Sequence, residues 1–278
     1  MADPARAAAA DAAAALTAPG ALPPVRAVLL DLDGTVCVRG RPVEGAAAAL
    51  TALRAQGLPL RFLTNIDSRT PDAIAGELSG LGLPVSVSDL FTPVSAAAAV
   101  IRGTDGARVY GLLSAALLPV VPRLATEPPY THVLVGDCRD VLDYPRLDAA
   151  FRALRDGAQL LALQRGRYFR SGDGDHVDTG AVVAGLEYAA GATARVLGKP
   201  SADFFALAAA GLGARLAECV VVGDDATTDI RGGRAAGAVT VQVRTGKFAD
   251  QDAEGLTGGA HLTLDSVADL PGVLRMAP

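Results

Sequence analysis

The chain has 278 residues, half of them apolar, and a formal net charge of −5. That length is enough for one large domain or two modest ones with ample core, while the acidic balance argues against nucleic acid as a partner, because a polyanion is bound through a basic surface. No uncharged apolar stretch reaches the roughly 18 residues that a membrane span requires, so no membrane partner is expected.

Residues 1–24 are mostly alanine and are expected to form a flexible tail. The segment lacks the basic start of a secretory signal and is interrupted by acidic residues. The three cysteines, Cys37, Cys138 and Cys219, are widely spaced and odd in number. They favour a reducing compartment, and so a cytoplasmic protein, over a disulfide framework or a zinc site.

From residue 25 onward, continuous apolar runs alternate with alanine-rich stretches of helical pattern. The apolar runs predict strands at Val25–Leu30, Leu58–Leu63, Val109–Leu113, His132–Val135, Gln159–Leu163, Cys219–Val222 and Val239–Val243. The stretches between them predict helices at Glu44–Gln56, Pro71–Leu81, Tyr144–Arg155, Thr179–Ala190, Ser201–Leu212 and Thr228–Ala236. Such alternation is typical of an α/β fold with parallel sheets, whose strands are covered on both faces.

Charged clusters stand at strand exits near both ends of the chain but not in its middle. We therefore expect a doubly wound, Rossmann-like parallel-sheet core built from residues 25–95 and 197–278. Residues 96–196 are then expected to form an inserted, smaller α/β domain.

The first cluster follows the apolar run that ends at Leu30. Asp31 is expected at the carboxyl end of a central strand, where doubly wound sheets bind ligands, and Asp33 on the same side after a turn at Gly34. A pair of carboxylates so placed allows one to attack phosphorus while the other moves protons. The alternative is an Asp-Gly turn without chemistry.

Two further clusters offer groups that suit a phosphate. Thr64 and Asn65 end the second predicted strand, and a hydroxyl with nearby backbone N–H groups there can bind phosphate oxygens, unless the pair only caps a turn. Lys199 precedes a predicted helix start and can neutralise a phosphorylated intermediate, unless it is a solvated lysine. The chain has only one other lysine, Lys247.

The last cluster is Asp224 and Asp225 after a strongly apolar run, with Asp229 at the start of a predicted helix. Hard oxygen ligands at this position suit Mg²⁺, which takes one or two carboxylates, waters and substrate phosphate. Asp225 and Asp229 are alternatively helix caps.

In this order, Asp-x-Asp-Gly-Thr, Thr-Asn, Lys-Pro and Gly-Asp-Asp with a later Asp resemble the motifs of the haloacid dehalogenase-like hydrolase superfamily. The resemblance covers residues 25–248 and is strongest to the subgroup with a large α/β cap inserted between the second and third motifs. It implies a phosphatase that uses Mg²⁺ and acts on a small phosphorylated compound.

The resemblance also implies a role for each matching residue. Asp31 is then the nucleophile that forms an aspartyl-phosphate, and Asp33 protonates the leaving group and activates water. Thr64 and Asn65 bind the phosphoryl oxygens, and Lys199 neutralises them. Mg²⁺ is bound by the Asp31 carboxylate, the Asp33 carbonyl and Asp224. Asp229 orients Lys199 or the waters on the metal, and Asp225 is a further candidate for that supporting role.

Two other places bear on the substrate. Asp67 stands where members of the family often carry a different residue, and it either disfavours strongly anionic substrates or is a solvated loop residue. The segment Arg165–Asp178 of the cap is the expected specificity region. Its candidate residues are Arg167, Tyr168, His176 and Asp178. The alternatives are a solvated hairpin and, for Asp178, a helix cap.

The sequence therefore predicts a cytoplasmic, Mg²⁺-dependent phosphatase acting on a phosphoamidate, pyrophosphate or a small phosphomonoester. Caps of this subgroup commonly dimerise, so the resemblance also implies a homodimer through the cap. Hydrolytic dehalogenation, phosphomutase activity and a non-catalytic regulatory role remain alternatives. Dehalogenation needs neither Asp33 nor a metal, and loss of Asp31 or Asp33 would have favoured a regulatory role.

Overall fold

The computed structural model describes residues 22–171 and 173–274. Most of the predicted tail, residues 1–21, lies outside the described residues. Contacts divide the described chain into two compact units. The first unit holds residues 22–63, 75–90 and 205–274, and the second holds Thr64–Ile74 and Phe91–Phe204. The boundaries at 25–95, 96–196 and 197–278 stay a prediction.

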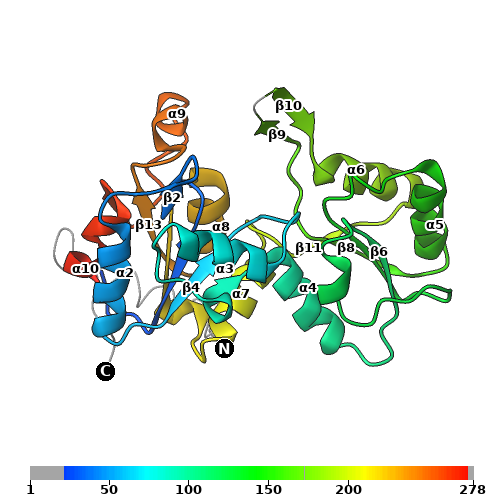
Figure 1. The fold of residues 1–278 in the computed structure, drawn as a ribbon, viewed down its shortest axis with the longest axis horizontal. Helices are drawn as coiled ribbons and strands as arrows, with labels where there is room; N and C mark the ends of the chain where they lie inside the picture. Colours follow the sequence, from blue (N-terminus) through cyan, green and yellow to red (C-terminus); the bar gives the residue numbers. More distant parts are fainter. Residues whose placement is uncertain (1–21, 172, 275–278) are drawn as a thin grey trace, which may run out of the picture. The chain divides into compact units, whose positions relative to one another are not determined.

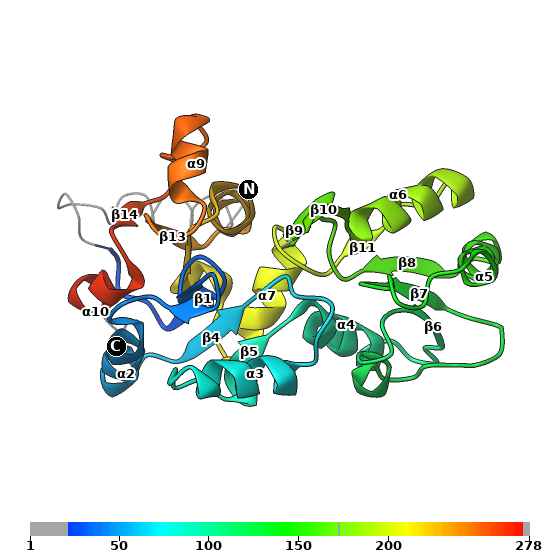
Figure 2. The same cartoon turned by 45° about the horizontal axis from the view of Figure 1, so that its top comes forward.

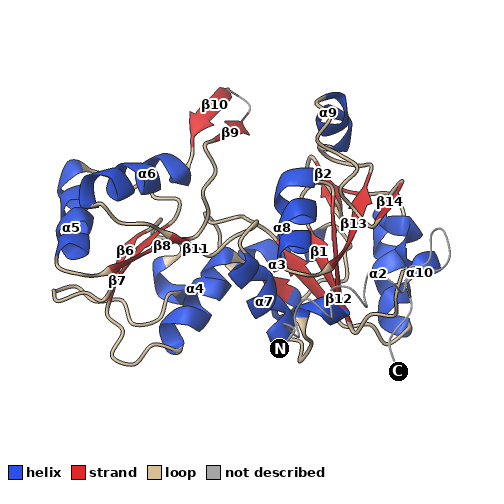
Figure 3. Ribbon diagram, turned by 180° about the vertical axis from the view of Figure 1, so that it is seen from behind, coloured by secondary structure: helices blue, strands red, loops and turns tan. Residues whose placement is uncertain are grey.

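Within the described residues, six strands form the sheet of the first unit, in the order β14-β13-β12-β1-β4-β5. In Figure 3 these strands are the red arrows grouped around β1 and β12. The pairs from β14 through to β4 are all parallel. The strands are β1 (Ala27–Asp31), β4 (Leu60–Leu63), β5 (Leu90–Phe91), β12 (Cys219–Gly223), β13 (Val239–Val243) and β14 (Leu262–Leu264).

The central strands are buried along their whole length. Every residue of β1, β12 and β13 is buried, and their sequences are almost continuously apolar. Strands of this kind occur where helices cover both faces of a parallel sheet. The parallel α/β core predicted from the sequence is therefore confirmed.

The strand order changes direction between β1 and β12. From β1 the chain adds β4 and β5 on one side, whereas the later strands β12, β13 and β14 extend the sheet on the other. Ligands of doubly wound sheets bind at such a point, beyond the carboxyl ends of the strands. Asp31 ends β1 and Asp224 directly follows β12, so both acidic clusters reach this position.

The helices of the first unit include a pair that is far apart in the sequence. Residues of α2 and α10 pack together, as Figure 1 shows in blue and red. Helices α3 and α7 contain points where the chain passes between the units. The bounds are α2 (Ala46–Ala55), α3 (Pro71–Gly80), α7 (Ala202–Ala210), α8 (Arg231–Ala235), α9 (Phe248–Ala253) and α10 (Leu270–Val273), with the short hairpin β2 (Cys37–Val38) and β3 (Arg41–Pro42).

The second unit has its own parallel sheet, with the strand order β11-β8-β7-β6 among its described residues. Helices α5 and α6 lie side by side and both pack on β7 (Figure 2). The elements are α4 (Pro93–Arg102), β6 (Val109–Leu112), β7 (His132–Val135), α5 (Tyr144–Arg155), β8 (Gln159–Ala162), β9 (Tyr168–Ser171), β10 (Gly174–Val177), α6 (Thr179–Ala190) and β11 (Arg195–Val196).

Several elements differ from the sequence prediction, which also gave no strand at β2, β3, β5, β11 or β14 and no helix at α9 or α10. Helix α4 was not predicted, although Thr92 caps it and Pro93 opens it. Strands β9 and β10 form an antiparallel hairpin, which the sequence had offered only as the alternative to a specificity loop. The helix predicted at Thr228–Ala236 is a π-helical turn at Ala226–Ile230 followed by the short α8, because the Ile230 N–H donates to the carbonyl five residues earlier.

None of the helices within the described ranges has the length and apolar character that a membrane crossing needs.

Truncation of Phe62 is predicted to destabilise the first unit strongly. Phe62 lies in β4 and is fully buried, so Phe62→Ala leaves a cavity and lowers the free energy of unfolding by about 3–5 kcal/mol. Phe248→Ala removes the same ring from a half-buried position and is expected to lower it much less. Urea unfolding of both variants measures the two losses, and equal losses would contradict the placement of Phe62 in the core.

Candidate active site

A tight turn after β1 presents the first acidic pair. The N–H groups of residues 35–37 all donate to the carbonyl oxygen of Leu32, at 2.9–3.3 Å. Gly34 adopts a φ of 103°, a conformation that glycine takes at little cost. The turn leaves Asp31 buried at the end of its strand and Asp33 exposed. The two carboxyl groups therefore have different environments although only one residue separates them.

Three buried carboxylates gather at the carboxyl ends of β1 and β12. Asp31, Asp224 and Asp229 each offer an oxygen within 4.8 Å of the others, and they are 6%, 1% and 1% exposed. Like charges this close repel one another, and the repulsion is stronger away from water. A bound divalent cation relieves it, and carboxylate oxygens are the ligands that Mg²⁺ prefers. By donor type and spacing, the set fits a metal ion.

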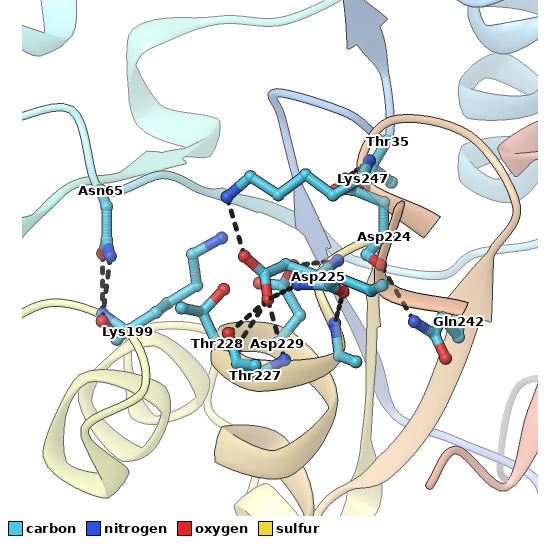
Figure 4. Close-up of polar contacts among 12 residues, drawn as sticks. Thr35, Asn65, Lys199, Asp224, Asp225, Thr227, Thr228, Asp229, Gln242 and Lys247 are labelled. Carbon is cyan, nitrogen blue, oxygen red and sulfur yellow. Dashed lines mark hydrogen bonds and ion pairs between the residues drawn. The ribbon is translucent and has the colours of Figure 1, made fainter. Parts of the chain in front are cut away.

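Asp224 is held by hydrogen bonds from three directions (Figure 4). Its side chain accepts from the Thr35 hydroxyl at 3.3 Å and from the Lys247 backbone N–H at 2.7 Å. Its carbonyl accepts from the Gln242 side chain at 3.0 Å. These bonds fix the carboxylate before any metal binds. Binding a metal ion therefore costs less side-chain conformational entropy.

Glycines allow the backbone to approach these carboxylates closely. A Cβ atom at Gly34 or at Gly246 would overlap the carboxylate of Asp224, and one at Gly223 would overlap the side chain of Asp229. Side chains at these positions would therefore fill the space around the acidic set.

Asp225 has a different environment from its neighbour Asp224. One oxygen accepts from Thr227, Thr228 and Gln251, and the other from the Lys247 amine at 2.8 Å. Burial raises the pKa of Asp225, but the hydrogen bonds from Lys247 and its other donors outweigh burial and hold the pKa below its usual range. The structure thus gives Asp225 the capping role that the sequence left open, because it begins the π-helical turn.

The three cysteine thiols are not nucleophiles at neutral pH. Cys37, Cys138 and Cys219 are buried free thiols, and burial raises the pKa of each to about 11. A thiol with so high a pKa is inert at neutral pH.

In the second unit, Asn65 holds the backbone of Lys199 at two points. Its side-chain amide donates to the Lys199 carbonyl at 2.9 Å, and its side-chain oxygen accepts from the Lys199 N–H at 2.8 Å (Figure 4). Lys199 and Thr64 are 5% and 2% exposed, and the Thr64 hydroxyl accepts from the Ile66 N–H at 3.1 Å. The Asn65 side chain therefore positions Lys199 in this structure.

Asp67 is buried, which rules out the solvated loop residue considered from the sequence. It is 6% exposed and accepts a hydrogen bond of 2.7 Å from the Thr179 hydroxyl. Burial is the main reason that its pKa is raised to about 6.

The cap candidates have unequal environments. Arg167, directly before β9, and Tyr168, in β9, are both exposed. His176 stacks on Phe169 and contacts Asp173 at 2.9 Å. Asp178 caps α6 by accepting from the Thr179 N–H, and it also accepts from Gln164. That is the alternative that the sequence left open for Asp178.

The structure thus brings the predicted residues into two groups. Asp31, Asp224 and Asp229 meet in the first unit, and Asn65 and Lys199 meet in the second. Sequence reasoning gave no role to Thr35, Gln242 or Lys247. The scarcity of lysine was the one signal for Lys247.

Comparison with known proteins agrees with the motifs. Residues 28–123 match a family model described as haloacid dehalogenase-like hydrolase, and residues 196–270 match one described as HAD-hydrolase-like. The chain is 34% identical over 242 residues to the human haloacid dehalogenase-like hydrolase domain-containing protein 2, covering 87% of this chain and 93% of that protein. It is 35% identical to the phospholysine phosphohistidine inorganic pyrophosphate phosphatase of Xenopus laevis, covering 82% and 86% of the two chains.

Solved structures show the same fold. NagD from Escherichia coli K-12 superposes with a TM-score of 0.80 at 28% identity, covering 89% of this chain and 98% of that one. The p-nitrophenyl phosphatase from Archaeoglobus fulgidus has a TM-score of 0.81 at 24% identity, covering 91% and 100%.

The glycine contacts predict a selective loss of metal binding. Gly34 and Gly40 both adopt positive φ angles, so alanine strains the backbone at either position, by about 1 kcal/mol. Only at Gly34 does the added Cβ meet Asp224, whereas nothing lies within 4 Å at Gly40. Calorimetric titration with Mg²⁺ is expected to show at least about tenfold weaker binding for Gly34→Ala and near-normal binding for Gly40→Ala. Equal affinities in the two variants would contradict the close approach at Asp224.

Proposed function

The chain belongs to the haloacid dehalogenase-like hydrolase family and is a phosphatase, and from this premise we propose that it hydrolyses small phosphorylated compounds through an aspartyl-phosphate on Asp31. The observation that carries the proposal is the meeting of Asp31, Asp224 and Asp229 at the carboxyl ends of β1 and β12. Hydrolytic dehalogenation needs neither the second carboxylate nor a metal, and the relatives and solved structures cited above include proteins named as phosphatases.

In the proposed reaction, a carboxylate oxygen of Asp31 forms a bond to phosphorus as the bond to the leaving oxygen breaks. Asp33 gives its proton to that oxygen. In the second step Asp33 takes a proton from water, the water oxygen bonds to phosphorus, and the bond to Asp31 breaks. The burial of Asp31 and the exposure of Asp33 support this division, because only an exposed group exchanges protons readily with solvent.

We propose Mg²⁺ as the metal. The carboxylates of Asp31 and Asp224 would hold it, with the Asp33 carbonyl as predicted from the sequence, and Asp229 would orient its waters or Lys199. When bound, the ion neutralises charge that develops on the phosphoryl oxygens. Asp225 is proposed only to support this arrangement, since hydrogen bonds already occupy both of its oxygens.

Thr64 and Lys199 are proposed to bind and neutralise the phosphoryl group. Thr64 directly follows Leu63, the residue that pairs with Asp31 in the sheet register. Lys199 has its backbone fixed by Asn65, which supports a role that depends on position. Asn65 is then a positioning residue in addition to the phosphate ligand that the motif implies.

The proposed substrates are small phosphomonoesters, phosphoamidates and pyrophosphate. The similarity to a protein named phospholysine phosphohistidine inorganic pyrophosphate phosphatase supports phosphoamidates and pyrophosphate. The fold shared with NagD favours none of the three substrate classes over the others. The proposed contacts to the leaving group remain Arg167, directly before β9, and Tyr168 and His176 on the β9–β10 hairpin. Asp178 becomes a weaker choice because it caps α6.

We further propose a cytoplasmic protein that forms a homodimer through its second unit. The buried free thiols support a reducing compartment. Helices α5 and α6 leave an apolar groove of about 320 Å³, lined by Leu147, Phe151 and Leu186 among others. Tyr144 and Tyr188 on the same helices are 80% and 92% exposed, as suits a surface that a second copy covers.

Replacement of the nucleophile is expected to abolish turnover. Asp31→Asn is predicted to lower phosphate release from p-nitrophenyl phosphate by at least about 10³-fold, because the amide cannot attack phosphorus. Asp265→Asn changes an exposed acid of the same unit and is expected to leave activity unchanged. Absence of release by the wild type across a panel of phosphomonoesters, phosphoamidates and pyrophosphate would overturn the enzyme assignment. Equal turnover with and without a chelator would overturn the metal.

Arginine substitutions on the surface formed by α5 and α6 test the proposed dimer. Tyr144→Arg with Tyr188→Arg is predicted to yield a monomer in light scattering, because burying two charges without partners is unfavourable. Val87→Arg alters a partly exposed apolar residue of the first unit and is expected to leave the dimer intact. A wild type that is monomeric at tens of micromolar would contradict the proposed dimer.

A further inference from the structure

The loop that follows β4, residues 64–70, is tied to two other segments of the second unit. Asn65 joins it to the backbone of Lys199 through two hydrogen bonds. Asp67 joins it to the first residue of α6, since the Thr179 hydroxyl donates to its carboxylate at 2.7 Å. Two side chains, two positions apart, therefore connect this loop both to Lys199 and to a helix that begins 112 residues later.

The second tie lies close to the proposed phosphate ligand. Three residues of extended chain span at most about 11 Å, so Asp67 cannot be farther than this from Thr64. The Thr64 hydroxyl is itself engaged by the Ile66 N–H, one residue before Asp67. A shift of Asp67 is thus transmitted to the Thr64 side chain through a very short path.

We propose that Asp67 is a positioning residue: with Thr179 it forms a latch that fastens the loop of residues 64–70 to α6 and so holds Thr64 and Asn65 where catalysis requires them. The inference rests on the proposed roles of Thr64 and Lys199. It concerns residues outside the motifs that carry those roles.

The surroundings of Asp67 are unfavourable for a charge. Burial raises its pKa most, the Thr179 hydrogen bond lowers it, and nearby Asp178 and Asp137 raise it further. Gln164 also donates toward Asp67, and Arg139 is paired with Asp137 at 2.6 Å. Cys138 adds no charge, because the pKa of its thiol is about 11. The pKa of about 6 that results places the ionisation of the latch within the working range of many enzymes.

The sign of the effect on stability follows from that pKa. A carboxyl whose pKa is higher in the folded chain than in the unfolded chain destabilises the fold at pH above about 6. The penalty shrinks as pH falls toward the ordinary value of 3.8. Asp67→Asn is therefore expected to unfold at a higher temperature than the wild type at pH 8, with a smaller difference at pH 4. A residue kept only for packing would show a loss of stability instead.

Catalytic activity is expected to respond to pH in the opposite sense to stability: it falls as pH drops, whereas the penalty on stability shrinks. A carboxylate accepts a stronger hydrogen bond than a neutral group does, so kcat/KM of the wild type for p-nitrophenyl phosphate should fall several-fold as pH drops through about 6. Asp67→Asn should lack this step and stay near the low-pH value. Thr179→Val, which removes the hydroxyl, should lower kcat/KM at pH 8 by about tenfold, and Thr179→Ser should restore it to within about twofold.

Three comparisons make the test decisive. In the double variant, Asp67→Asn with Thr179→Val, the losses should not add, because both changes break one contact. Asp143→Asn alters the cap of α5 in the same unit and should leave the pH profile unchanged. Carbon-13 NMR of the Asp67 carboxyl should show a pKa near 6 in the wild type and a higher pKa in Thr179→Val.

A step at pH 6 that persists in Asp67→Asn, additive losses in the double variant, or an unchanged Asp67 pKa in Thr179→Val would each overturn the latch. The NMR measurement needs no turnover. If the wild type releases no phosphate, the proposed function fails, while the pKa of Asp67 in Thr179→Val still decides whether the latch exists.

Discussion

The repulsion among three buried carboxylates is the constraint on which the first unit depends. Asp31, Asp224 and Asp229 lie within 4.8 Å of one another in a part of the molecule that water scarcely reaches. Hydrogen bonds to Asp224, the glycines beside it and the turn after β1 all serve to keep these groups close. A site that holds like charges together in this way is prepared for a cation and for a phosphate that binds to it.

In the second unit, hydrogen bonds fix the relative positions of separate segments. Two side chains of its 64–70 loop hold other segments: Asn65 is hydrogen-bonded to the main chain of Lys199, and Asp67 accepts from the side-chain hydroxyl of Thr179 at the start of α6. In the proposed mechanism the first unit supplies the acidic set, and the second unit supplies Lys199 in a fixed position. Phosphoryl transfer requires both, since its catalysis consists mainly of positioning and charge neutralisation.

The sequence predicted β1, β12 and β13 well because strands buried on both faces have continuous apolar runs. Motif order also placed Asp31 and Asp224 in one predicted metal site, with the Asp33 carbonyl as a further ligand and Asp229 in a supporting role. The contacts of Lys247 and Thr179 could not be predicted from the sequence, because each joins residues 22 or more positions apart. The β9–β10 hairpin was only an alternative in the sequence analysis, because β10 is largely exposed and lacks a pattern of buried residues.

The metal site is tested most directly by anomalous scattering from a crystal grown with Mn²⁺ in place of Mg²⁺. We predict a single strong peak within bonding distance of carboxylate oxygens of Asp31 and Asp224, and its loss in Asp224→Asn. A map with no peak at the carboxyl ends of β1 and β12, or with Mn²⁺ bound only to exposed acids elsewhere, would contradict the view that these buried carboxylates are arranged around a cation.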